Sequence, residues 1–83
     1  MEKTYNGWKN RETWNCALWI QNDENLYNAA CEYVQKHKTQ KALYRGFIYS
    51  MGMDRTRTPD GILWDGARLD YAALNEMMRE LIS

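Results

Sequence analysis

The stretch from Trp8 to Asp23, WKNRETWNCALWIQND, decides the fold, because it combines three tryptophans with the pattern of a central helix. Asn10 is suited to cap that helix, since its side chain can accept hydrogen bonds from free backbone amides. Two apolar rows follow at helical spacing, and they consist of Trp14, Ala17 and Leu18 and of Cys16, Trp19 and Ile20. A helix that is apolar around most of its circumference is buried on several sides. The stretch therefore predicts a central helix over residues 10–22.

The tryptophans of this stretch raise the question of whether they build the core or a binding surface. We expect Trp14 to be largely buried at the centre of the domain, with Trp8 folded over it. We expect Asn15 to bond the backbone of the N-terminal arm. Trp19 borders the polar stripe of Asn15 and Asn22. If the stripe is a contact surface, Asn15, Trp19 and Asn22 are the partner-binding residues.

Two further helices are predicted in the middle of the chain. Asp23 is suited to cap an amphipathic helix over 24–37, and Thr39 a helix over 40–51. The segment GFIYSM at 46–51 is rich in β-branched and aromatic residues and could also form a strand, but the helix is favoured. The expected inward positions of the third helix are Leu43, Tyr44, Phe47, Ile48 and Met51.

The C-terminal third predicts a long loop followed by a last helix. Residues 54–69 contain the only proline and two Asp-Gly pairs, so they predict an ordered loop, or a short hairpin, pinned by Trp64. Asp70 is a clear helix cap, and the helix it starts extends over 71–82. Residues 1–9 show no period and predict an arm laid on the domain.

The composition fits a small domain whose core is built from large aromatic side chains. The chain has 83 residues, with four tryptophans, six tyrosines and five methionines. One aromatic side chain buries about 150–250 Å², so a few of them suffice for a dense core. We therefore expect an all-α fold, a single four-helix domain over 1–83 with an N-terminal arm and one long loop before the last helix.

Charge is balanced overall but uneven along the chain. Lysine plus arginine equal aspartate plus glutamate at eleven each, which argues against a generally basic nucleic-acid binder. Residues 36–57 nevertheless carry six basic residues and one acidic residue. The plain interpretation is a solvated helix face, and the alternative is a nucleic-acid-binding module. The residues that would serve this alternative are Lys36, Lys38, Lys41, Arg45, Arg55 and Arg57.

Motifs of known catalytic chemistry are absent from the sequence. The glycines form no phosphate-binding loop, no G-x-S-x-G elbow is present, and a single histidine with two cysteines predicts no zinc site. We expect Cys16 and Cys31 to be free buried thiols, with a disulfide between them as the open alternative. Capping explains the acidic residues at the turns. No enzyme activity, cofactor or metal is therefore expected.

The chain also lacks the signals of membrane insertion or secretion. No run approaches the about 18–20 apolar residues of a membrane span, and the polar start MEKTYNGWKN has no apolar secretory core. We expect a soluble intracellular protein.

Both ends of the chain resemble one family. The N-terminal part follows the pattern N-x-W-x-N-x-x-T-W-N-x-x-L-W-I-x-N-D, and its matching positions are Asn6, Trp8, Asn10, Thr13, Trp14, Asn15, Leu18, Trp19, Asn22 and Asp23. The segment TPDGILWDGARLDYAALNEMMREL at 58–81 is similar to that family's ending. The family consists of small, largely uncharacterised proteins of phages, prophages and plasmids.

The resemblance implies an accessory protein of a phage or another mobile element, in the cytoplasm of a bacterial host. It supplies no catalytic residues. Together with the missing catalytic motifs, it leads us to expect a non-enzymatic protein that binds a host or phage protein, with interference in a host defence system as one way to act.

Overall fold

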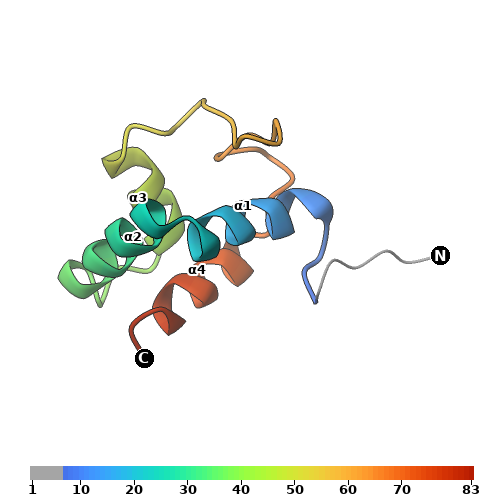
Figure 1. Cartoon of the computed structure of the whole chain (residues 1–83). Helices are drawn as coiled ribbons and strands as arrows, with labels where there is room; N and C mark the ends of the chain where they lie inside the picture. The colour runs from blue at the N-terminus through green and yellow to red at the C-terminus, as the bar shows by residue number, and fades with distance from the viewer. Residues whose placement is uncertain (1–6) are drawn as a thin grey trace.

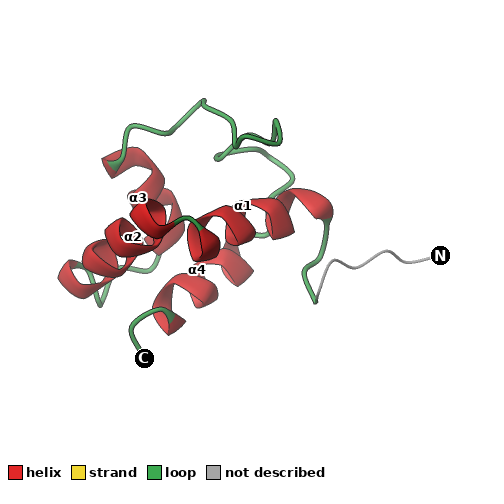
Figure 2. Ribbon diagram, viewed as in Figure 1, coloured by secondary structure: helices red, strands yellow, loops and turns green. Residues whose placement is uncertain are grey.

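The computed structural model describes residues 7–83, and its regular secondary structure there consists of four α-helices. They are α1 (Arg11–Asn22), α2 (Glu24–Lys36), α3 (Leu43–Ser50) and α4 (Tyr71–Glu80). Figure 2 shows helices and loops but no strand in the described part of the chain. The predicted all-α, four-helix class is confirmed. Residues 1–6 of the predicted arm lie outside the described residues.

Three of the predicted helix caps are confirmed. The Asn10 side chain accepts a hydrogen bond of 2.9 Å from the Thr13 backbone amide at the start of α1. Asp23 ends α1 and also caps α2, which leaves no other residue between the two helices. Asp70 caps α4 through the backbone amide of Ala73. Each cap satisfies a backbone donor that the first turn of a helix leaves without a partner.

The predicted cap of the third helix is wrong. The helix begins after Ala42 rather than after Thr39, and Ala42 has no side chain able to cap. A residue of α4 supplies the missing cap: the side-chain oxygen of Asn75 accepts a hydrogen bond of 2.9 Å from the Tyr44 backbone amide. A residue 31 positions further along the chain therefore satisfies the start of α3.

The segment at 46–51 continues the helix as far as Ser50, so the favoured helix is confirmed over the strand. Met51 was expected to face inward, but it is 42% exposed. The reason is that α3 ends one residue earlier and the chain turns away at Gly52, whose φ of 69° lies in the left-handed region that glycine tolerates.

The core lies between the helices and takes side chains from all four of them and from the loop before α4. Its buried apolar residues are Cys16, Ala17, Ile20, Ala30, Val34, Leu43, Tyr44, Phe47, Ile48, Trp64, Leu69, Leu74, Met77 and Met78. Within α3 and α4 these residues recur three or four positions apart, as one face of a helix requires.

Trp14 is not part of this core, which corrects the prediction that it lies at the centre of the domain. It is only partly buried. The inward face of α1 is formed by Thr13, Cys16, Ala17 and Ile20, which are all fully buried. Because successive residues of an α-helix are about 100° apart, Trp14 falls on the flank of that face. The buried indole is Trp64, which is 4% exposed, so its predicted role in pinning the loop is confirmed.

Candidate functional site

The segment between α3 and α4, residues 51–70, is the candidate functional region, and we call it the α3–α4 loop. In Figure 1 it leaves the end of α3, arches over α1 and returns to α4. An isolated antiparallel bridge joins Arg57 and Leu63 within it, so the segment is the expected loop, and the alternative of a short hairpin is reduced to a single bridge. The loop lies against the side of α1 that carries Asn15, because Thr58 and Asp60 both bond the Asn15 side chain. Asn15 lies about 200° around the helix from Thr13.

Several hydrogen bonds fix the second half of the loop to the helices. The Asn10 side chain donates a bond of 2.8 Å to the Arg68 carbonyl, and the Tyr44 hydroxyl donates one of 2.6 Å to the Trp64 carbonyl. Burial raises the pKa of Tyr44 well above its usual range, so this hydroxyl stays protonated and able to donate. The loop is thus bonded to the N-terminal cap of α1 and to α3.

The first half of the loop is held by four side chains, Asn15, Trp19, Thr58 and Asp60, which we call the Asn15 network. The Thr58 hydroxyl donates a bond of 2.7 Å to the Asn15 side-chain oxygen. The Asn15 amide and the Trp19 indole N–H donate bonds of 2.8 and 2.9 Å to the same carboxylate oxygen, Oδ2 of Asp60. The Thr58 hydroxyl oxygen also accepts from the backbone amides of Asp60 and Ile62. Two residues of α1 thereby fix the conformation of the turn at 58–62.

The network favours the ionised form of Asp60. The hydrogen bond from Asn15, followed by that from Trp19, lowers the pKa of this carboxyl, and the charge of Arg11 acts in the same direction. Both hydrogen bonds favour the charged form because a carboxylate is the stronger acceptor. Asp60 therefore acts as an anionic acceptor between the helix and the loop.

The structure brings two of the three predicted partner-binding residues together and leaves the third apart. Asn15 is 1% exposed and half-buried Trp19 shares its acceptor. Exposed Asn22 instead donates a bond of 3.0 Å to the carbonyl of Leu18 in its own helix. Asn15 was also expected to bond the N-terminal arm, but residues 1–6 of that arm lie outside the described residues. In the part of the chain that the structure describes, its amide group bonds Thr58 and Asp60 of the loop. Trp8 lies beside α4.

Sequence reasoning missed Thr58 and Asp60 as partners of α1. Asp60 was explained as a turn residue, and it does form part of a turn. The available signal was an asparagine within a helix that is otherwise apolar, because a buried amide requires polar partners. The Thr-Pro-Asp-Gly turn offered such partners, but no local pattern connects it with Asn15.

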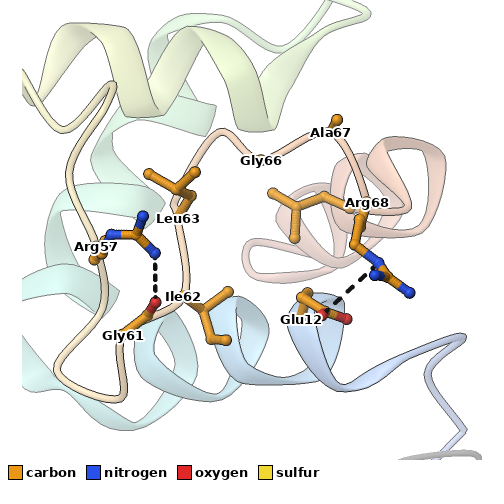
Figure 3. Close-up of a pocket in the computed structure, with 9 residues that line it drawn as sticks. Glu12, Arg57, Gly61, Ile62, Leu63, Gly66, Ala67 and Arg68 are labelled. Carbon is orange, nitrogen blue, oxygen red and sulfur yellow. Dashed lines mark hydrogen bonds and ion pairs between the residues drawn. The ribbon is translucent and has the colours of Figure 1, made fainter.

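A hollow of about 210 Å³ lies next to the Asn15 network. Figure 3 shows Arg57, Gly61, Ile62 and Leu63 on one side of it and Ala67, Arg68 and Glu12 on the other. The apolar lining is supplied by Ile62, Leu63, Ala67 and Leu69. Loop and helix α1 together thus form a small apolar hollow with charged residues around it, which we call the loop hollow.

The charged residues of the loop hollow are held to different degrees. The Arg57 guanidinium donates a bond of 2.8 Å to the Gly61 carbonyl, which fixes it along one wall (Figure 3). Arg68 and Glu12 form an ion pair at 3.9 Å, and the Arg68 side chain is 79% exposed. An exposed pair at this distance contributes little to stability. Arg68 is therefore free to reorient when another molecule approaches.

The six residues of the nucleic-acid alternative are all exposed, and they lie on several segments: the end of α2, the connection to α3, α3 itself and the α3–α4 loop. Figure 1 places the connection between α2 and α3 at one end of the molecule, far from the part of the α3–α4 loop that arches over α1. One local cluster combines cationic and aromatic groups, because the Arg45 guanidinium lies 4.8 Å from the centre of the Tyr71 ring. On the same helix, four residues after Arg45, Tyr49 is 60% exposed.

Within residues 7–83, no three side chains of the metal-binding types His, Cys, Asp and Glu gather into a possible ion site. Cys16 and Cys31 are both free; Cys16 is buried as expected, but Cys31 is only partly so. Burial raises the pKa of the Cys16 thiol to about 11, which keeps it in the unreactive protonated form. In the same range, none of the helices combines the length and the apolar character needed to cross a membrane.

The fold and the loop hollow define a small all-α protein whose central helix positions a structured loop. The chain belongs to the Family of unknown function (DUF7249), whose model matches residues 1–83. The resemblance to an uncharacterised family is thus confirmed. A search of curated proteins and a search of solved structures each give no significant match.

Proposed function

We propose that this protein is a non-enzymatic module that binds another protein through the α3–α4 loop. The observation that carries the proposal is the loop hollow, which two α1 side chains hold in shape through Thr58 and Asp60. A preformed apolar hollow surrounded by polar groups suits an anchor residue of a partner, and such anchors dominate the energy of protein interfaces. A rigid loop also avoids the entropic cost of ordering on binding.

The roles of the polar groups support binding rather than catalysis. Asn15 and Thr58 are buried and bonded to each other, and the Asp60 carboxylate already accepts two side-chain hydrogen bonds. A general base or nucleophile needs lone pairs directed at a substrate. The Asn15 oxygen accepts from Thr58, the Thr58 oxygen accepts from loop amides, and Oδ2 of Asp60 accepts from α1. These bonds hold the loop against the helix, so the groups maintain the surface.

The resemblance of the N-terminal signature supports the biological setting of the proposal. We place the protein among the accessory proteins of phages and other mobile elements, acting inside a bacterial host. Its partner is then a host or phage protein, and a component of a host defence system is one such partner.

A site-specific photo-crosslinking experiment tests this function. A photoreactive amino acid replaces exposed Ala67 at the loop hollow or, as a matched control, exposed Lys36 at the end of α2. In host cells that contain the mobile element, position 67 should give one discrete crosslinked protein and position 36 none. The same set of products from both positions, or no product from position 67, would contradict the proposal.

Nucleic-acid binding through the basic segment is the second candidate. The observation in its favour is the cluster of Arg45 and Tyr71 with exposed Tyr49, since arginines and aromatic rings together bind single-stranded nucleic acid. Fluorescence anisotropy with labelled single-stranded DNA at low salt tests it. Binding that weakens steeply as salt rises supports this candidate, because phosphate contacts release counterions. No binding at tens of micromolar protein rules it out.

A further inference from the structure

The loop hollow has the volume for one side chain rather than for a cofactor. Small-molecule sites usually enclose about 300–1,000 Å³, whereas this hollow encloses about 210 Å³. The residues that supply its lining are mostly apolar, with Ile62, Leu63 and Leu69 among them. Such a space favours a single large aliphatic or aromatic side chain, which gains by leaving water.

The residues that line the loop hollow include two basic side chains, Arg57 and Arg68, and one acidic side chain, Glu12. Arg57 forms no ion pair with any residue in the range 7–83, where the salt bridges are Arg68 with Glu12 and Arg79 with Glu76. The one acidic side chain that lines the hollow, Glu12, already faces Arg68. The bond to the Gly61 carbonyl uses one N–H group of Arg57 and leaves other guanidinium donors available.

We propose that the loop hollow binds an acidic segment of a partner protein, which inserts one large apolar side chain and places a neighbouring carboxylate against Arg57. This inference rests on the proposed function and names the chemistry of its partner. Arginine suits the role because its planar guanidinium can bind a carboxylate through two parallel hydrogen bonds. Arg68 adds a second positive charge once it leaves its weak pair with Glu12.

Two short peptides of equal length serve as probes, Gly-Asp-Leu-Asp-Gly and Gly-Lys-Leu-Lys-Gly with blocked ends. They are titrated into the full ¹⁵N-labelled protein while its backbone amide signals are followed by NMR. The acidic peptide should produce saturable shifts at Glu12 and at 61–69, and the basic peptide should not. Equal shifts with both peptides, or shifts confined to other regions, would overturn the inference.

Three variants show whether the shifts arise from the loop hollow. Arg57→Gln removes the charge and should weaken binding of the acidic peptide about fivefold. Lys36→Gln removes the same charge from α2 and should leave binding unchanged. Ala67→Trp fills the hollow from an exposed position and should abolish the shifts. The amide spectrum of each variant without peptide shows whether it is folded.

Failure of this inference differs from failure of the proposed function. If position 67 crosslinks one partner and Arg57→Gln leaves that crosslink and the peptide affinity unchanged, the binding function holds and the acidic chemistry is wrong. If the acidic peptide binds as expected but no partner crosslinks in cells, the chemistry of the hollow holds and the proposed function is wrong.

Discussion

The side-chain amide of Asn15 in α1 donates a hydrogen bond of 2.8 Å to Asp60, 45 residues further along the chain. The other end of the same amide accepts a bond of 2.7 Å from the Thr58 hydroxyl. One buried side chain of the central helix thereby bonds both sides of a turn in the α3–α4 loop. The shape of the loop hollow depends on this arrangement, because Gly61 and Ile62, which line it, directly follow Asp60.

Replacement of Asn15 by Ala should lower the free energy of unfolding by about 1–3 kcal/mol, the range for leaving a buried polar group without its partner. The group concerned is the Thr58 hydroxyl, which would lose its acceptor while Thr58 is 4% exposed. Urea denaturation measures the loss. Asn22→Ala is the matched control in the same helix and should change stability by less than about 0.5 kcal/mol. Equal losses for the two variants would contradict the role given to Asn15.

Acid should weaken the bonds between α1 and the loop through Asp60. Its pKa in the folded protein lies below the ordinary value of 3.8, so ionised Asp60 contributes stability that is fully present above 3.8. That contribution is lost as the pH falls through the lower, folded pKa. Asp60→Asn keeps the shape of the side chain but removes its ionisable carboxyl group. The difference in unfolding free energy between the wild type and this variant should therefore shrink on acidification. A difference that is constant from about pH 7 to 2 would show that Asp60 is not coupled to folding.

Gly46 should not tolerate alanine, although alanine is the better helix former by about 1 kcal/mol. A Cβ atom at this position would collide with the Tyr33 hydroxyl oxygen and with the side-chain nitrogen of Gln40. Gln40 can rotate away, but the tyrosine ring is packed between His37 and Phe47. We expect Gly46→Ala to destabilise the protein by about 1–3 kcal/mol in thermal or urea unfolding.

Tyr33→Phe provides the control for this prediction, because it removes the hydroxyl that blocks the added methyl group. In the double variant Tyr33→Phe with Gly46→Ala, the cost of the alanine should be smaller than in the wild-type background. An alanine cost that is the same in both backgrounds would show that the close contact with Tyr33 is not the cause.

Trp64 should be more important for stability than Trp14. Trp64→Ala removes an indole that is 4% exposed and should cost about 3–5 kcal/mol. That loss is most of the stability of a small domain, for which about 5 kcal/mol is common. Trp14→Ala should cost less and leave a folded protein, since Trp14 lies on the flank of α1. Circular dichroism melts compare the two, and a larger loss for Trp14→Ala would contradict the burial pattern.

The sequence predicted those features of the fold that depend on neighbouring residues. The caps Asn10, Asp23 and Asp70 were correctly identified because capping is a contact over three positions. The start of α3 was placed wrongly because its capping partner, Asn75, belongs to another helix. A sequence pattern contains no information on which distant side chain will reach a helix end.

The burial of the tryptophans of α1 could not be predicted for a similar reason. α1 is apolar on many sides, so its pattern leaves open which side faces the core and which faces the loop. Once the loop occupies the Asn15 face, Trp14 is left on the flank and Trp19 becomes a donor to Asp60. The loop hollow depends on this same contact between distant segments, and no sequence motif predicted that contact.

Native-state hydrogen exchange of the loop amides tests the central claim most directly, namely that α1 holds the α3–α4 loop in one preformed shape. The informative amides are those of Thr58, Ile62 and Trp64, which donate to the Ile62 carbonyl, the Thr58 hydroxyl oxygen and the Thr56 carbonyl. We expect these amides to exchange as slowly as those in the middle of α1 and to become fast in Asn15→Ala. Exchange in the wild-type protein at the rate of an unstructured peptide would contradict a preformed loop hollow.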